Sequence, residues 1–94
     1  MANIDLDDLT AFKILAETSS FSDAAKTIPI SQSAFSRRIE KLETALDARL
    51  VERTTRRVTL TAVGRDFYRN INRIMTDLDR TVLGIKGVSL SLIH

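Results

Sequence analysis

The side chains best suited to chemistry in this chain are amides, hydroxyls and guanidinium groups, and they gather in one segment. Residues 31–46 read SQSAFSRRIEKLETAL, and a helix has about 3.6 residues per turn. One face of such a helix carries Gln32, Ser33, Ser36 and Arg37, here called the polar face. A glutamine amide bonds adenine through N6 and N7, and arginine bonds guanine or phosphate. The polar face is therefore predicted to contact DNA bases.

The opposite side of the same segment is apolar. Phe35, Ile39, Leu42 and Leu46 form one stripe, which indicates the core side of an amphipathic helix. Arg38 lies about 100° around the helix from Arg37 and is expected to contact the DNA backbone or to pair with an acid. The remaining positions are interpreted as an ordinary solvated outer face: Glu40, Lys41, Glu43 and Thr44.

Three helices must position the polar face. Leu6, Leu9, Phe12 and Leu15 recur every three residues, which predicts a first helix from near Asp5. A second helix over residues 23–28, capped by Ser22, is predicted next. A turn follows because Ile28 precedes Pro29 and is pushed out of helical geometry, and Ser31 then caps a third helix that runs to about Leu46. Two helices joined by a short turn make a helix-turn-helix, whose second helix enters the major groove in DNA-binding examples.

A β-hairpin is predicted after the third helix, as in a winged helix. Two β-prone runs flank Thr54, Thr55 and Arg56. Charges on a hairpin can simply prevent edge-to-edge pairing, but three arginines (Arg53, Arg56 and Arg57) beside the polar face favour DNA. Narrow minor grooves attract arginine, so Arg56 at the tip is predicted to enter one. The predicted contacts to the DNA backbone are Ser31, Arg38, Arg53, Thr54, Thr55, Arg57 and Thr61, although threonine is also common in turns and caps that bind no ligand.

Thr61 is predicted to cap a long fourth helix. Its apolar residues step by three or four, close to the a/d seam of a coiled coil: Phe67, Ile71, Ile74, Leu78, Val82 and Ile85. From Thr61 to Ile85 the helix would span about 37 Å. Core packing within a monomer is the alternative interpretation. Because one stripe of this length exceeds what a core of roughly 60 residues covers, a partner helix and hence a homodimer are predicted.

The predicted domain organisation has three parts. Residues 1–60 form a winged helix-turn-helix, and residues 61–87 form a linker and dimerisation helix that ends at Gly84 and Gly87. Residues 88–94 alternate apolar and polar like a strand, and an isolated strand is not stable. They are expected to be the truncated start of a missing effector domain. The predicted fold class is mainly α: three helices, a two-stranded wing and a long helix.

Composition narrows the possible functions. The 94 residues fit one small domain, or one domain with an extension, and they contain no cysteine. Thiolate metal sites and cysteine nucleophiles are thereby excluded, and the one histidine is the last residue, His94. The acids Asp7, Asp8, Asp77 and Asp79 read as surface or cap charges, so no catalytic residue, metal or cofactor is predicted. No apolar run approaches the roughly 20 residues that cross a bilayer, and no secretory signal is recognisable. A cytoplasmic protein that is not an enzyme is expected.

Positive charge is concentrated in the middle of the chain. Residues 1–30 carry two basic against five acidic side chains, residues 31–69 nine against five, and residues 70–94 three against two. The basic excess coincides with the polar face and the hairpin, as in a nucleic-acid binder. A winged-helix module that docks proteins is the rival interpretation, but its face should be more apolar. Single-stranded RNA is disfavoured because the five aromatic residues fall mostly at core-type positions and leave no stacking platform.

Four segments together resemble the N-terminal domain of LysR-type transcriptional regulators: Phe21–Ala25, Ile30–Glu43, Leu50–Arg57 and Leu60–Gly64. The combination of Ser-Gln-x-x-x-Ser-Arg, a Leu-Glu pair, the arginine-tipped wing and Leu-Thr-x-x-Gly is specific, and the resemblance covers residues 6 to about 87. It implies a bacterial regulator that binds double-stranded operator DNA as a homodimer through antiparallel linker helices. It also implies a C-terminal domain, absent from this chain, that senses a small effector and builds tetramers.

The resemblance also assigns roles to single residues. The polar face would enter the major groove and Arg56 the minor groove, while Arg53 would hold phosphate or brace the wing. Four residues depart from the usual pattern. Ser33 stands at a frequent proline, which leaves its base preference open, and Phe35 and Val51 replace a smaller aliphatic residue and a phenylalanine. Asp47 stands at the glycine that usually ends the helix, where aspartate tolerates left-handed geometry. The predicted function is sequence-specific DNA binding on a dyad-symmetric operator.

Overall fold

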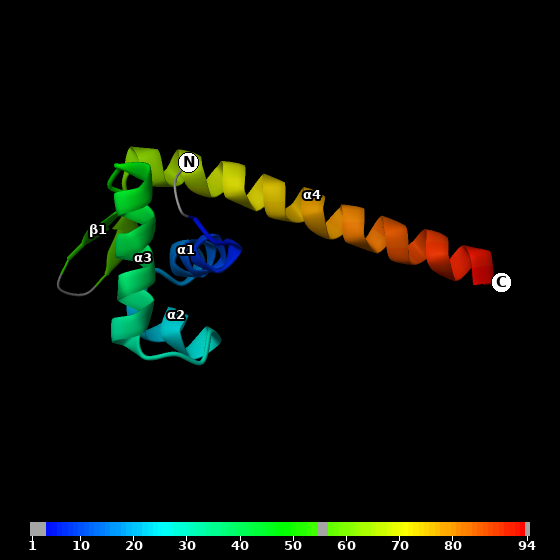
Figure 1. Ribbon diagram of the computed structural model, residues 1–94. Coiled ribbons are helices and arrows are strands. Elements are labelled where there is room, and N and C mark those ends of the chain that lie inside the picture. The colour runs from blue at the N-terminus through cyan, green and yellow to red at the C-terminus, as the bar shows by residue number, and fades with distance from the viewer. Residues whose placement is uncertain (1–3, 55–56, 94) are drawn as a thin grey trace.

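Four helices and one hairpin make up the fold, which a computed structural model describes for residues 4–54 and 57–93, with side chains up to residue 86. The elements are α1 (Leu6–Thr18), α2 (Phe21–Thr27), α3 (Gln32–Leu46), β1 (Val51–Arg53), β2 (Val58–Leu60) and α4 (Ala62–Ile93). The first three helices and the hairpin form one unit, and α4 projects away from it (Figure 1). The predicted fold class, a mainly α winged helix-turn-helix followed by a long helix, is confirmed.

Capping residues decide where the first two helices begin. α1 begins at Leu6 with Asp5 as its N-cap residue, so the predicted start near Asp5 is confirmed. α2 begins at Phe21, because the Ser20 hydroxyl accepts a hydrogen bond from the Asp23 N–H at 3.2 Å. The prediction that Ser22 caps a helix over residues 23–28 is therefore wrong, and Ser22 is exposed in the first turn. Both serines suit a cap, but only the earlier start buries Phe21 as part of the core.

The turn and α3 follow the predicted pattern closely. Ile28 is extended before Pro29, so α2 ends at Thr27, one residue earlier than predicted. The Ser31 hydroxyl accepts from the Ala34 N–H at 3.1 Å and caps α3. At the other end, Asp47 adopts the left-handed conformation with φ 50°. Both predicted ends of α3 are confirmed.

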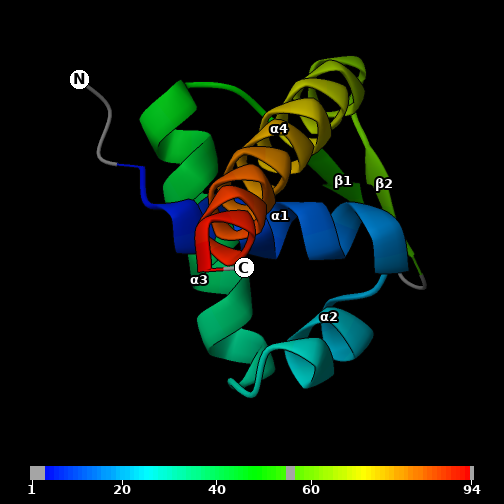
Figure 2. The same cartoon turned by 90° about the vertical axis from the view of Figure 1, so that its right-hand side faces the viewer.

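A small apolar core fixes the rotation of α3. The largest fully buried side chains are Phe12, Leu15, Phe35, Ile39, Leu42 and Leu50. The first three residues of the predicted α3 stripe are thus buried, and Leu46 is partly buried at its end. Figure 2 shows α1 running across α3, with α2 near the beginning of α3. Because one side of α3 is committed to this core, the polar face must point outward.

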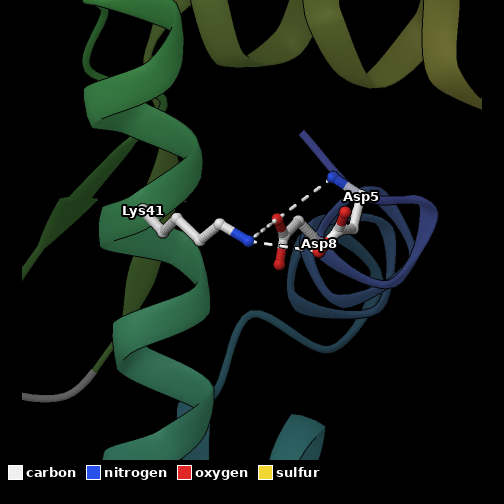
Figure 3. A network of polar contacts seen from close by, with 3 residues as sticks. All are labelled: Asp5, Asp8 and Lys41. Carbon is white, nitrogen blue, oxygen red and sulfur yellow. Dashed lines mark hydrogen bonds and ion pairs between the residues drawn. The ribbon is translucent and has the colours of Figure 1, made fainter. Parts of the chain in front are cut away.

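An ion-pair network also holds α3 against α1. Lys41 Nζ lies 3.1 Å from the carboxylate of Asp8 and 3.2 Å from that of Asp5 (Figure 3). Asp8 is only 3% exposed and also accepts the Asp5 backbone N–H at 3.3 Å. Hydrogen bonds from Lys41 to Asp8 and then to Asp5 raise the pKa of the Lys41 ammonium above its ordinary 10.5. Lys41 is exposed, as expected of the outer face, but its ammonium also pairs with two acids at the start of α1, which the sequence interpretation did not include.

Glu43 was expected on the same solvated face and is likewise a structural residue. Its carboxylate accepts backbone N–H groups from Leu50 at 2.8 Å and from Val51 at 3.4 Å. Leu50 is 1% exposed, and a buried N–H without an acceptor is costly. Glu43 therefore anchors the start of the hairpin to α3.

The hairpin pairs its two short strands antiparallel, with Val51 opposite Leu60. The Thr54 N–H donates to the Arg57 carbonyl at 2.9 Å and closes it. The predicted strands are thus confirmed, whereas Thr55 and Arg56, for which contacts to the DNA backbone and the minor groove are predicted, lie outside the described residues.

The start of α4 is packed closely against the rest of the fold. The Thr61 hydroxyl accepts from the Gly64 N–H at 2.9 Å and caps the helix, as predicted. Phe67 then lies against Phe12, with ring centroids 5.4 Å apart, and Ile71 is 5% exposed.

The far end of α4 differs from the prediction. The helix continues through Gly84 and Gly87 to Ile93, so the expected end at these glycines is wrong, and the tail expected to be strand-like is helical over residues 88–93. A glycine inside a helix costs about 1 kcal/mol relative to alanine, which weakens a helix without ending it. A strand needs a partner, and alternation alone supplies none. Over the described residues, no helix has the length and apolar content needed to cross a bilayer.

Candidate nucleic-acid interface

The polar face lies on the outer side of α3. Gln32, Ser33 and Arg37 are exposed, and Ser36 is partly buried. Together with Glu40 they line one shallow hollow in the surface. The structure therefore brings together the four residues that the helical period grouped, on the side opposite the buried stripe.

The wing extends this surface beyond α3. Gln32 also lines a neighbouring hollow with Arg53, Thr54 and Arg57 of the hairpin. Amide, hydroxyl and guanidinium groups from two elements are thus adjacent. The result is a continuous exposed surface of hydrogen-bonding groups around the beginning of α3.

Arg53 connects the wing to two helices. Its Nη2 donates to Ser36 Oγ at 2.8 Å and lies 3.9 Å from a carboxylate oxygen of Glu40. Its guanidinium carbon lies 4.3 Å from the centroid of the Phe21 ring, a cation–π arrangement. The structure thus shows the bracing contact that was one of the two roles expected of Arg53. Its contact with phosphate stays a prediction.

Two threonine hydroxyls among the predicted phosphate ligands already donate hydrogen bonds to backbone carbonyls. Thr61 Oγ1 donates to the Arg49 carbonyl at 2.6 Å, and Thr54 Oγ1 donates to the Arg57 carbonyl at 2.9 Å. A hydroxyl has one proton to donate, and phosphate oxygens only accept. Thr54 and Thr61 would have to break these bonds to hold phosphate, whereas the capping bond of Ser31 uses its oxygen and leaves its proton.

Arg38 lies on a different side of α3 from Gln32 and Ser33. It is partly buried, and together with Arg37 and Lys41 it lines a hollow beside the acids at the start of α1. Both expectations for Arg38, a backbone contact or pairing with an acid, stay predictions.

The six seam positions of α4 divide into two groups. Phe67 and Ile71 pack on the globular unit, and the Tyr68 hydroxyl donates to Glu17 of α1 at 3.0 Å. Burial and this bond raise the pKa of the Tyr68 phenol. The other four seam residues are between 42% and 64% exposed: Ile74, Leu78, Val82 and Ile85. They recur every three or four residues and so lie in a row. The part of α4 that carries them projects from the fold (Figure 1).

Sequence reasoning missed the contacts that hold the interface in shape. Lys41 meets Asp5 across 36 positions, and Arg53 meets Ser36 across 17. Contacts so distant in the chain leave no periodic trace. For Glu43 a signal was available in the sequence: the start of the first strand was predicted to be apolar, and buried N–H groups need an acceptor. Glu43 supplies this acceptor to Leu50.

The family model for bacterial regulatory helix-turn-helix proteins of the lysR family matches residues 6–65. Among curated relatives, a protein of Escherichia coli strain K12 described as the uncharacterized HTH-type transcriptional regulator YbhD is similar. It is 42% identical over 85 residues, which are 90% of this chain and 27% of that protein. The chain thus spans about a quarter of the length of such relatives.

Solved structures show the same fold. The structure titled as a complex of the BenM DNA-binding domain with benA site 1 DNA has a TM-score of 0.87 and 32% identity, covering 92% of this chain and 97% of that chain. The domain in the CbnR–DNA complex has a TM-score of 0.83 and 29% identity, covering 92% and 99%. The chain therefore belongs to the lysR family of bacterial regulatory helix-turn-helix proteins and is the DNA-binding domain of a LysR-type transcriptional regulator.

Proposed function

We propose that this chain binds double-stranded operator DNA sequence-specifically, with α3 in the major groove and the wing at the minor groove. The observation that carries the proposal is the continuous exposed surface of Gln32, Ser36, Arg37 and the hairpin. Its groups are those that bond base edges and phosphates. The DNA complexes among the similar structures support the same role.

The proposed contacts divide by the part of DNA they meet. Bases are met by Gln32, Ser33, Ser36 and Arg37 in the major groove and by Arg56 in the minor groove. Backbone phosphates are met by Ser31, Arg38, Arg53, Thr54, Thr55, Arg57 and Thr61, of which Thr54 and Thr61 would exchange their present bonds to backbone carbonyls for phosphate. Phosphate contacts orient the domain, and base contacts supply specificity.

We further propose a homodimer through α4. Ile74, Leu78, Val82 and Ile85 are exposed apolar residues at coiled-coil spacing, and a second copy of the same helix fits such a row by symmetry. Pairing would place two copies of α3 on one dyad-symmetric operator. In the whole protein, of which this chain matches about a quarter in its relatives, we propose an effector-sensing domain, further assembly to tetramers and a cytoplasmic location.

A titration of fluorescent duplexes tests DNA binding. Duplexes selected from a random library by the chain are titrated at two salt concentrations. Gln32→Ala and Arg37→Ala should each weaken specific binding by about 1–3 kcal/mol, and Arg56→Ala should do the same. If Arg37 meets phosphate instead, its removal should flatten the salt dependence by about one unit of slope.

The matched control is Arg80→Ala, which removes the same charge from an exposed position far along α4. It should leave the affinity for the selected duplex nearly unchanged. Wild-type binding by all three variants of the interface would show that the assigned surface is wrong. Absence of duplex binding at low salt would favour the rival interpretation, a module that docks proteins.

A further inference from the structure

Ser36 is the residue of the polar face whose hydroxyl is already bonded within the protein. Its oxygen accepts the Arg53 Nη2 proton at 2.8 Å. A hydroxyl has one proton to donate and two lone pairs, and Arg53 occupies one of these lone pairs. In the described part of the chain, the Ser36 hydroxyl makes no second hydrogen bond, so its proton is available to a ligand.

Arg53 is held in place independently of Ser36. Its guanidinium carbon lies 4.3 Å from the centroid of the Phe21 ring, and its Nη2 lies 3.9 Å from Glu40. Phe21 is 8% exposed and meets Phe35 of the core edge to face, with ring centroids 6.0 Å apart. The Arg53 donor therefore approaches Ser36 from a position that the folded core determines.

We propose that Arg53 is a positioning residue for DNA recognition, which fixes the Ser36 hydroxyl as a hydrogen-bond donor and so selects an acceptor on the DNA. This inference rests on the proposed function. Two effects act together. One lone pair of Ser36 is occupied, and the neighbouring positive charge disfavours an approaching N–H donor while favouring an electronegative acceptor.

The groups exposed in the DNA grooves determine which atoms a Ser36 donor can bind. Acceptors in the major groove are N7 and O6 of guanine, N7 of adenine and O4 of thymine, whereas N4 of cytosine and N6 of adenine are donors. A phosphate oxygen is an acceptor as well. Ser36 should therefore discriminate against a donor base at its position, or hold a phosphate, depending on how deeply α3 enters the groove.

A binding-site selection from a random duplex library, followed by titrations, tests this inference. The full chain is compared with Ser36→Ala, Arg53→Met and Arg53→Lys. Methionine keeps an apolar stem beside Phe21 and removes the donor, whereas lysine keeps both a donor and a charge. If Ser36 meets a base, wild type should prefer an acceptor base over a donor base at one position by about fivefold or more. Ser36→Ala and Arg53→Met should each reduce this to within about twofold, and Arg53→Lys should restore part of it.

The matched control is Arg57→Met. Arg57 is an exposed arginine at the other side of the same hairpin, and among the described residues no hydrogen bond joins it to Ser36. Its removal should lower the salt slope by about one and leave the base preference intact. In the Arg57→Met background, Ser36→Ala should reduce the base preference as much as it does in wild type. In the Arg53→Met background, Ser36→Ala should change the base preference very little.

Modified duplexes separate the two possible acceptors. Replacing the preferred base by an analogue that lacks its major-groove acceptor (7-deaza for N7 of a purine, or the matching change at O6 of guanine or O4 of thymine) removes the base acceptor, and a neutral methylphosphonate removes the phosphate charge. Only one of the two should make wild type resemble Ser36→Ala.

The outcomes separate this inference from the proposed function. The inference is overturned, with DNA binding intact, if Arg53→Met keeps the wild-type base preference and the wild-type response to the modified duplexes, and if its effects add to those of Ser36→Ala. A wild-type chain that binds no duplex would overturn both. A circular dichroism melt of each variant verifies that it is folded, so that a loss of preference is not a loss of structure.

Discussion

Replacing Gly64 by alanine tests how closely α4 begins against the hairpin. A Cβ at this position would lie 2.0 Å from the carbonyl oxygen of Leu50 and 2.9 Å from its carbon. Both are backbone atoms of a residue that is 1% exposed, so no side chain can rotate away. Reaching an ordinary contact of 3.4 Å would require a shift of about 1.4 Å between α4 and β1. That shift also breaks the bond from the Thr61 N–H to the Leu50 carbonyl, which is 3.0 Å long.

These changes set the expected magnitude. Overpacking of a closely packed site costs about 1–3 kcal/mol, and the lost hydrogen bond costs about 1 kcal/mol. Against this, the higher helix propensity of alanine stabilises α4 by about 1 kcal/mol relative to glycine. The net loss in the free energy of unfolding is therefore about 2 kcal/mol. For a domain of this size each kcal/mol shifts the melting temperature by about 4–8 °C, so Gly64→Ala should melt roughly 10 °C below wild type.

Gly84→Ala is the matched control because it makes the same chemical change in the same helix. A Cβ at Gly84 meets nothing within 4 Å, so this variant should melt no lower than wild type and gain helicity by circular dichroism. All melts are run at one protein concentration, since the melting temperature of a dimer depends on it. Equal melting temperatures for Gly64→Ala and Gly84→Ala would refute the reasoning.

Three further changes test other contacts. Because the pKa of Lys41 is raised in the folded state, the stability from its ion pairs is complete below its ordinary 10.5 and is lost as the pH rises through the folded pKa. Thermal melts in a pH series should therefore decline at alkaline pH, and Lys41→Met should decline less; the raised pKa of Tyr68 acts in the same direction and remains in both. Glu43→Ala leaves the buried Leu50 N–H without its acceptor and should cost about 1–3 kcal/mol in urea unfolding, whereas Glu43→Gln retains an acceptor and should cost less; equal losses would contradict this role. Leu78→Asp on the exposed seam should convert the proposed dimer to a monomer in sedimentation, whereas Thr76→Asp on another side of α4 should not, and an unchanged Leu78→Asp dimer would exclude this seam as the interface.

Local patterns in the sequence were sufficient to predict α3. Ser31 and Asp47 mark its two ends, and the apolar period of Phe35, Ile39 and Leu42 fixes which side is buried. A helix that buries one side must expose the other, so the polar face followed from the same period. The fold class followed because each cap, turn and strand signal acts within a few residues.

Local patterns gave the wrong prediction for the start of α2, where two residues are equally suited to cap a helix, and for the end of α4. Ser20 and Ser22 are both good caps, and burial of Phe21 chose between them. Gly84 and Gly87 weaken a helix, yet α4 continues through both of them to Ile93.

The sequence by itself therefore determined the order of the elements, the ends of α3 and the residues of its outer face, since these depend on neighbours one helical turn away. Only the tertiary structure decided that Lys41 meets Asp8, that Glu43 holds the start of β1, and that Arg53 bonds Ser36 beside Phe21. The physical reason is that these contacts join elements brought together by burial of the shared core. Burial sets the distance between α3 and the wing, and that distance makes Arg53 a partner of Ser36.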